Sequence, residues 1–157
     1  MPETSVPFDS DKGPDPHFEA TELIYRRVPE TFFHDNEVLP HAFDWPAPSV
    51  LRSKYSKPEH ALHRYCCDDK QLQGQWVIAE VKISDLPTPF GVEAGKSMHF
   101  LVLHVPLPKC YAHSEIRCRR EGEDQLRLRP NNKVLKELYL VELAKRAVIV
   151  YGPVHMS

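Results

Sequence analysis

The chain has 157 residues, of which 41% are hydrophobic and 27% charged, enough apolar material for one core and too little for two. Lysine and arginine number 20 against 22 aspartates and glutamates, giving a formal net charge of −2. This balance disfavours a protein whose main activity is binding nucleic acid, because neutralising phosphates needs a basic excess. The 15 prolines and 6 glycines predict short strands, since proline removes a backbone donor and fixes φ.

The N-terminus and the cysteines indicate the compartment. Residues 1–20 carry acidic side chains where a secretory signal has a basic start and an apolar run. No stretch reaches the roughly 20 apolar residues of a membrane span. The cysteines include the adjacent pair Cys66 and Cys67, which do not readily bridge to each other. Reduced thiols fit this pattern best, so we expect a cytoplasmic protein without a membrane segment.

The expected fold class is α+β, with a mixed sheet of five or six short strands and two main helices. Residues 1–20 are rich in Pro, Asp, Ser and Gly and hold too little apolar surface to offset chain entropy. We therefore expect a flexible N-terminal tail over 1–20 and a single α+β domain over 21–157. The predicted strands lie at 22–28, 49–53, 75–83, 98–105, 110–118 and 147–151.

Four details of this pattern are specific enough to check. Residues 42–45 form a further short strand candidate, interrupted by prolines that indicate an edge or a loop. Residues 75–83 form the clearest strand, which we expect at the centre of the sheet. Residues 98–105 are almost continuously apolar and predict a strand buried on both faces. A single helical turn is expected over 30–34.

Two helices have recognisable starts. Ser56 can cap the first, with Pro58 in the first turn and Glu59 completing a capping box, and we expect this helix to run to about Cys66. Asn132 can cap the second, over residues 133–146. The apolar stripe expected on this second helix consists of Val134, Leu135, Leu138, Val141 and Leu143.

Histidines and cysteines gather between residues 99 and 118 and are the ligand types that zinc prefers. Only Cys110 and His113 form a compact Cys-x-x-His pair, and the paired knuckles of common zinc sites are missing. The candidate zinc ligands are His104, Cys110, His113 and Cys118. The alternative is that these are ordinary core and surface residues.

A cysteine nucleophile beside a histidine is a further possibility, because a thiolate next to a base attacks electrophiles. Cys66 and Cys110 are the candidates. The alternative is that both are buried as small hydrophobic residues.

An arginine, a serine and a glutamate follow one another along the predicted strands: Arg26 or Arg27, then Ser49 or Ser53, then Glu115. This order resembles the arginine-type ADP-ribosyltransferase-like fold. In that family a first-strand arginine holds the NAD phosphates and a serine-bearing strand supports the nicotinamide pocket. A late glutamate orients the acceptor or polarises the ribose. The chain departs from the pattern at His113, where the family has Glu or Gln.

The chemistry implied by this resemblance is coherent. A guanidinium matches a diphosphate bidentately, and a carboxylate stabilises an oxocarbenium ion. The segment Ser49-Val50-Leu51 differs from the family's Ser-Thr-Ser type of motif. The resemblance implies an NAD-dependent transferase or NAD glycohydrolase, with catalytic candidates Arg26, Arg27, Ser53, His113 and Glu115. The alternative is a solvated strand face on which Glu115 pairs with a neighbouring cation.

Three short segments resemble a pattern found in a family of small bacterial proteins: Leu23–Pro29 (LIYRRVP), Ser53–Glu59 (SKYSKPE) and the stretch 106–116 that ends in HSEI. This resemblance implies a bacterial, single-domain protein and no particular activity.

No phosphate-binding glycine loop occurs in the sequence, and the arginines around residues 121–124 flank acidic residues as in a solvated hairpin. By exclusion, we expect a non-enzymatic accessory or partner-binding protein of a bacterial multi-protein system, with the tail free to order on a protein partner. The alternatives are the NAD-using enzyme and a small zinc-binding domain. The oligomeric state stays open.

Overall fold

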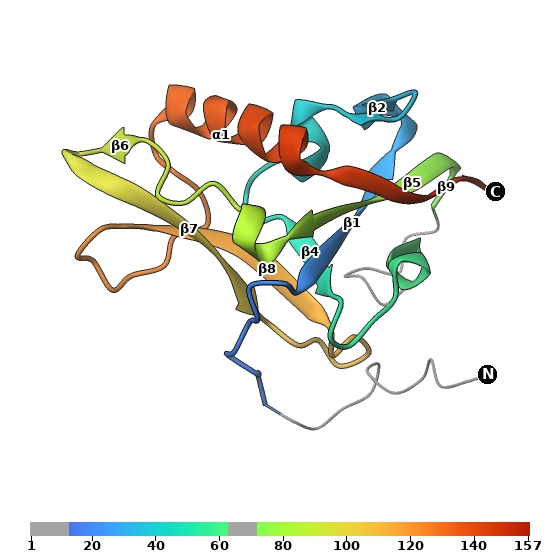
Figure 1. Ribbon diagram of the computed structural model, residues 1–157, viewed down its shortest axis with the longest axis horizontal. Helices are drawn as coiled ribbons and strands as arrows, with labels where there is room; N and C mark the ends of the chain where they lie inside the picture. Colours follow the sequence, from blue (N-terminus) through green and yellow to red (C-terminus); the bar gives the residue numbers. More distant parts are fainter. Residues whose placement is uncertain (1–12, 63–71) are drawn as a thin grey trace.

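A seven-stranded sheet forms the frame of the molecule, with strand order β6-β7-β8-β4-β1-β5-β9 (Figure 1). The structure is a computed structural model that describes residues 13–62 and 72–157. Every neighbouring pair in this sheet is antiparallel. The strands are β1 (Leu23–Pro29), β4 (Ser49–Arg52), β5 (Gly74–Lys82), β6 (Val92–Glu93), β7 (Lys96–His104), β8 (His113–Arg120) and β9 (Val148–Met156), while β2 (Phe33–His34) and β3 (Glu37–Val38) pair separately.

The expected α+β class, a mixed sheet of five or six strands with two main helices, is wrong. Of the described residues, 40% are in strands and 21% are helical, and among them α1 (Lys133–Arg146) is the one α-helix. The other helical segments of that part of the chain are short 3-10 turns: η2 (Glu30–Phe32), η3 (Pro40–Phe43), η4 (Pro58–Leu62) and η6 (Ile83–Asp85).

The helix expected after Ser56 is replaced by the 3-10 turn η4, and the expected cap does not form. The Ser56 hydroxyl donates to the Arg52 carbonyl at 2.6 Å instead of accepting from the first turn. His60 Nδ1 accepts from the Lys57 amide at 3.1 Å, which closes a tight local turn. The expected continuation towards Cys66 lies outside the described residues. Residues 42–45 are likewise not a strand, since η3 occupies 40–43.

The second helix is confirmed, although its apolar stripe is not. Asn132 Oδ1 accepts from the Leu135 amide at 2.9 Å and caps α1. Of the predicted stripe, Leu135 and Leu143 are buried, whereas the other members face outward. The exposed members are Val134 (67%), Leu138 (53%) and Val141 (36%). Their places against the sheet are taken by Tyr139 and Leu140.

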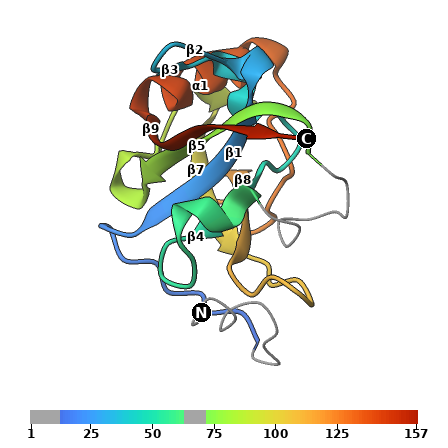
Figure 2. The ribbon, with the colours of Figure 1, turned by 90° about the vertical axis from the view of Figure 1, so that its right-hand side faces the viewer.

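Successive residues of each strand point to opposite faces of the sheet and build two apolar clusters. Ile24 and Ile116 contribute to the first, which α1 covers through Tyr139, whose ring stacks on Phe100 with centroids 3.6 Å apart. Figures 1 and 2 show α1 along this face and η4 on the other side of β1. Residues of the second cluster include Tyr25, Leu51, Ile78, Ala61 and Leu62.

Strand β7 alternates between buried and partly buried residues, so the prediction that it is buried on both faces is wrong. The central position predicted for 75–83 is only partly met, because β5 lies one strand from the edge formed by β9.

Among the described residues, Arg52 has the largest fully buried side chain, which is 0% exposed. Its Nε and Nη2 donate to the Glu22 carboxylate at 2.7 and 3.0 Å. The same guanidinium donates to the Asp15 carbonyl at 2.7 Å and the His17 carbonyl at 2.6 Å. It also lies 3.8 Å from the centroid of the Phe18 ring. Arg52 therefore fastens the segment before β1 to the end of β4.

Asp15 continues this attachment on the side of β7. Its carboxylate accepts from the Tyr55 hydroxyl at 2.6 Å and from Lys54 at 2.9 Å, and these two bonds hold the pKa of Asp15 well below its usual value. Its amide donates to His104 Nδ1 at 2.8 Å. Since Nδ1 accepts, the ring hydrogen is on Nε2, which donates to the Tyr111 carbonyl at 2.6 Å.

The expected division into a tail over 1–20 and a domain over 21–157 stays a prediction, because residues 1–12 lie outside the described residues. Of the tail residues that are described, Asp15, His17 and Phe18 contact side chains of the sheet. In the described ranges, no helix has both the length and the apolar character needed to cross a bilayer.

Replacing Arg52 tests the buried ion pair. Arg52→Met leaves the Glu22 carboxylate, 7% exposed, without its cation, and removing one partner of such a pair costs about 3 kcal/mol or more. We expect the free energy of unfolding, measured by urea denaturation, to fall by that amount. The matched control is Arg129→Met at an exposed position.

The double variant Arg52→Met with Glu22→Met removes both charges and is expected to recover part of the loss. A loss below about 1 kcal/mol for Arg52→Met alone would contradict the structural role given to this guanidinium.

Lowering the pH is expected to destabilise the fold at pH values well above those at which carboxylates become protonated. Burial lowers the pKa of both His104 and His113, so the unfolded chain binds protons on these residues that the folded chain resists. The stability they contribute is complete above the unfolded histidine pKa of about 6.5 and is lost as the pH falls below it. Urea midpoints measured between pH 7.5 and 5 should decrease; a constant or rising midpoint would contradict this.

Candidate functional site

Strands β1 and β4 separate beyond Tyr25, and this opens a gap in the sheet. Their pairing covers Ile24 with Arg52 and Tyr25 with Leu51, while β1 continues beside β5 as far as Pro29. Arg26 lies at the point of separation. Its Nε donates to the Ala42 carbonyl at 3.0 Å and its Nη1 to the Ser49 carbonyl at 2.8 Å. A cationic side chain thus bridges β1, η3 and the start of β4.

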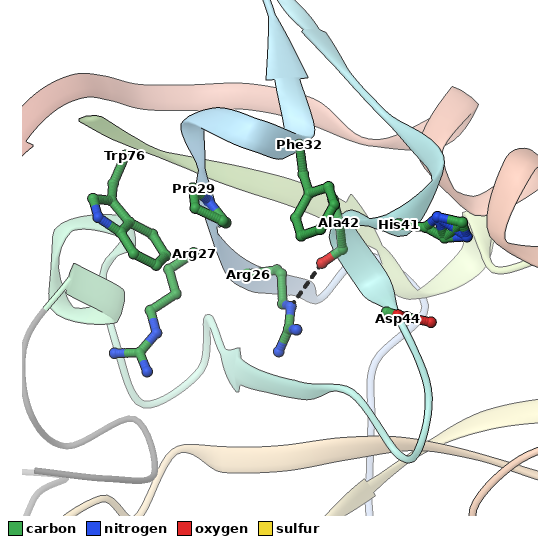
Figure 3. A pocket seen from close by; sticks show the side chains of 8 residues that line it. All are labelled: Arg26, Arg27, Pro29, Phe32, His41, Ala42, Asp44 and Trp76. Carbon is green, nitrogen blue, oxygen red and sulfur yellow. Dashed lines mark hydrogen bonds between the residues drawn. The ribbon is translucent and has the colours of Figure 1, made fainter. Parts of the chain in front are cut away.

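A pocket of about 330 Å³ lies beside this gap, a size at the lower end of the range for small-molecule sites. Figure 3 shows both arginines extending from β1, with the Arg27 guanidinium on the side of Trp76 and the Arg26 guanidinium beside Ala42. The Arg27 guanidinium carbon lies 5.9 Å from the centroid of the Trp76 ring. The complete lining is Arg26, Arg27, Pro29, Phe32, His41, Ala42, Asp44 and Trp76.

The lining defines the ligands that the pocket suits. Two guanidinium groups attract anions and match the geometry of phosphate oxygens, while the Trp76 indole offers a flat surface on which a ring can stack. Asp44 and His41 lie at the exposed opposite side. The combination suits a ligand that carries both an anionic group and an aromatic ring.

Ser49 lies next to Arg26 and pairs across the sheet with Glu115 of β8. His113 Nε2 lies 3.1 Å from Ser49 Oγ, and His113 Nδ1 lies 2.8 Å from the Val105 carbonyl. His113 is 3% exposed, and its burial lowers its pKa. Glu115 accepts from Arg117 Nε at 2.8 Å, so the expected pairing with a neighbouring cation is present as well.

Four of the predicted residues are therefore close in the sheet. Arg26, Ser49, His113 and Glu115 come from β1, β4 and β8, and β4 lies between the other two strands. Arg27 lines the same pocket as Arg26. Ser53 is not part of this group, because its Oγ accepts from the Leu23 amide at 2.9 Å, at the opposite end of β1.

The sequence order left Ser49 and Ser53 as alternatives, with Ser53 among the catalytic candidates; in the structure Ser49 lies beside Arg26 and Glu115, and Ser53 bonds the Leu23 amide instead. Only the register of β4 against β8 separates the two serines, and that register cannot be deduced from the strand pattern. Trp76 and His41 were missed too. In the sequence, Trp76 looks like any aromatic residue of a strand. His41 lies on the 3-10 turn η3, which the sequence did not predict.

The four candidate zinc ligands do not meet. Both ring nitrogens of His104 and of His113 bond to the groups described above. Burial raises the pKa of the Cys118 thiol to about 12, and Cys118 belongs to the cluster under α1, whereas Cys110 belongs to the opposite cluster. Across 13–62 and 72–157, no three His, Cys, Asp or Glu side chains are placed to hold a metal ion. Zinc binding stays a prediction.

The cysteine-nucleophile hypothesis is also without geometric support in the described part of the chain. Cys110 is buried, at 1% exposure, and packs with Leu51 and Ile78 as a small hydrophobic residue. Cys66 lies outside the described residues.

Known proteins do not identify this site or the family of the chain. No family model, no curated protein and no solved structure matches the chain.

Proposed function

We propose that the chain is an NAD-using transferase or glycohydrolase, which breaks the bond between nicotinamide and ribose. One observation carries the proposal: Arg26, Ser49 and Glu115 occupy three neighbouring strands where β1 and β4 separate, in the order that the ADP-ribosyltransferase-like resemblance implies. Had Glu115 and the two arginines lain at opposite ends of the sheet, this proposal would have had no basis.

The pocket chemistry supports the same substrate class. NAD carries a diphosphate between two nucleosides, and Arg26 and Arg27 supply positive charge at the pocket wall. The Trp76 indole offers a stacking surface for one of its rings. The hydrogen bonds of Arg26 to the Ala42 and Ser49 carbonyls fix its orientation, which lowers the entropy lost on binding.

In the proposed reaction, the bond between ribose C1′ and the nicotinamide nitrogen breaks, and its electron pair leaves with nicotinamide. The ribose acquires oxocarbenium character, which the Glu115 carboxylate stabilises. The oxygen of water or of an acceptor hydroxyl then bonds to C1′, and its proton passes to Glu115. Arg117 orients this carboxylate through the bond between its Nε and Glu115. The expected setting remains a bacterial cytoplasm.

A glutamate substitution tests the proposal. The wild-type protein, incubated with NAD, should release nicotinamide, measured by chromatography. Glu115→Gln removes the charge while keeping the shape, so turnover should fall by about 100-fold or more. The control is Glu121→Gln, an exposed glutamate just after β8 that bonds His99, which should keep wild-type turnover. NAD that stays intact with the wild type, or equal turnover with Glu115→Gln, would contradict the proposal.

The two serines provide a second comparison with the same assay. Ser49→Ala should lower turnover, because Ser49 lies between Arg26 and Glu115. Ser53→Ala should leave turnover nearly unchanged, because its hydroxyl serves the Leu23 amide. The reverse ranking would show that the register of β4 does not define the site.

Partner binding as a non-enzymatic accessory protein is the second candidate function. It is supported by apolar side chains that face outward on the edge strand β9, namely Val148 (58%), Val150 (38%) and Tyr151 (39%). Exposed apolar side chains along an unpaired sheet edge are typical of surfaces that bind another chain. Native protein that elutes as a monomer without associates from its own cell extract would count against this candidate.

A further inference from the structure

The backbone groups of β7 point alternately to its two edges. Met98 bonds away from β8, since its carbonyl accepts from the Phe90 amide at 2.8 Å. Because hydrogen-bonded and non-hydrogen-bonded residues alternate along an antiparallel pair, every second residue of β7 faces the same edge as Met98. The Phe100 amide accordingly donates to Thr88 Oγ1 at 2.9 Å. The amide and the carbonyl of Val102 therefore face this outer edge too.

The outer edge of β7 is open beyond Phe100 in the described part of the chain. β6 pairs only with the start of β7, at Lys96 and Ser97 (Figure 1). Among the described residues, none bonds to the outward amide or carbonyl of Val102. Val102 is nevertheless only 8% exposed, and buried backbone groups are normally paired because leaving them unpaired costs free energy. The edge thus offers a ligand one donor and one acceptor.

A pocket of about 420 Å³ lies against this open edge. Three consecutive residues of β7 line it, namely Phe100, Leu101 and Val102. Successive side chains of a strand point to opposite faces of the sheet, so a pocket that touches three residues in a row lies at the edge of the strand. The segments 16–18 and 83–88 supply the other walls.

These walls are apolar on the face of the sheet that α1 covers. Phe18 and Ile83 pack against the first apolar cluster, to which Leu86 and Val102 belong. The Arg52 guanidinium lies 3.8 Å from the centroid of the Phe18 ring and holds this wall in place. Within the described ranges, the lining contains no carboxylate, lysine or arginine. The pocket therefore suits apolar side chains.

We propose that this edge binds an extended, apolar segment of a partner protein, which adds a strand antiparallel to β7. The residue opposite Val102 accepts from the Val102 amide and donates to the Val102 carbonyl. Its side chain points to the same face as that of Val102, which is the apolar face of the pocket. A small apolar molecule would fill the pocket but leave both backbone groups of Val102 unpaired.

The walls of the pocket decide against a second copy of the chain as the occupant. The open edge is recessed between the segments 16–18 and 83–88. Two copies that approached edge to edge would meet at these walls before their β7 backbones reached hydrogen-bond distance, whereas a single extended chain is slim enough to enter. The pocket shares no residue with the one at Arg26, so this proposal is independent of NAD.

The first test needs no ligand and uses amide hydrogen exchange of the full chain, measured by NMR. Leu101 and Leu103 direct their amides to β8, so the Val102 amide should exchange at least about tenfold faster than theirs. Slow exchange of Val102 in the monomer would show that the chain itself covers the edge. Protection that appears only as the protein concentration rises would show that a second copy covers it. Either result overturns the proposal.

The second test titrates the protein with the peptide acetyl-Lys-Thr-Val-Thr-Val-Thr-Lys-amide, followed by NMR. We expect saturable shifts at Phe18, Leu86 and Val102 and slower exchange of the Val102 amide. Methyl groups on both valine nitrogens remove the donors that face β7 and should weaken binding at least about tenfold. The matched control carries the methyl groups on two threonine nitrogens, which face away from β7, and should bind within about threefold of the parent peptide.

A variant of the wall completes the test. Phe18→Ala removes an apolar wall and should weaken peptide binding at least about fivefold. The control Phe32→Ala removes a ring from the pocket at Arg26 instead and should keep the wild-type affinity. Absence of saturable shifts at millimolar peptide, equal weakening by the two methylations, or unchanged affinity in Phe18→Ala overturns the proposal and leaves the NAD proposal intact. Loss of the NAD activity with peptide binding retained overturns only the NAD proposal.

Discussion

The buried guanidinium of Arg52 joins the segment before β1 to the end of β4. Arg52 forms an ion pair with Glu22 and donates hydrogen bonds to the carbonyls of Asp15 and His17. If the segment before β1 detached, the buried guanidinium would lose these partners. Burying a charge costs several kcal/mol unless it is fully hydrogen-bonded. Each nitrogen of the Arg52 guanidinium has a hydrogen-bond acceptor, and these bonds fix the end of β4.

The candidate site lies at the other end of the same short strand. β4 has four residues, with Ser49 at its start and Arg52 at its end, so the anchoring of Arg52 also limits where Ser49 can be. Arg26 likewise donates to two backbone carbonyls, those of Ala42 and Ser49, at the point where the pairing of β1 with β4 ends. Each arginine donates to two backbone carbonyls, and Arg26 also lines a pocket.

Local signals in the sequence predicted well the elements that depend on local contacts. Asn132 and the following residues predicted α1 at its true bounds, and the strands fell within a few residues of their observed positions. The capping box expected at Ser56 does not form: the Ser56 hydroxyl donates to the carbonyl of Arg52, four residues earlier at the end of β4. Strand order and direction depend on contacts distant in the sequence, so an antiparallel sheet could not be told from a mixed one. Asp15 and Arg52 looked like ordinary polar residues.

The order of Arg26, Ser49 and Glu115 along the chain is visible in the sequence. Their proximity depends on the order of β8, β4 and β1 in the sheet, which the sequence does not show. The most direct test of the account is an NMR titration of the labelled protein with NAD. The account predicts that the largest shifts fall on the Trp76 indole, on Arg27 and on the amides of Ser49 and Glu115, saturating together. Shifts confined to β9 and the outer face of α1, or no shifts at millimolar NAD, would contradict it.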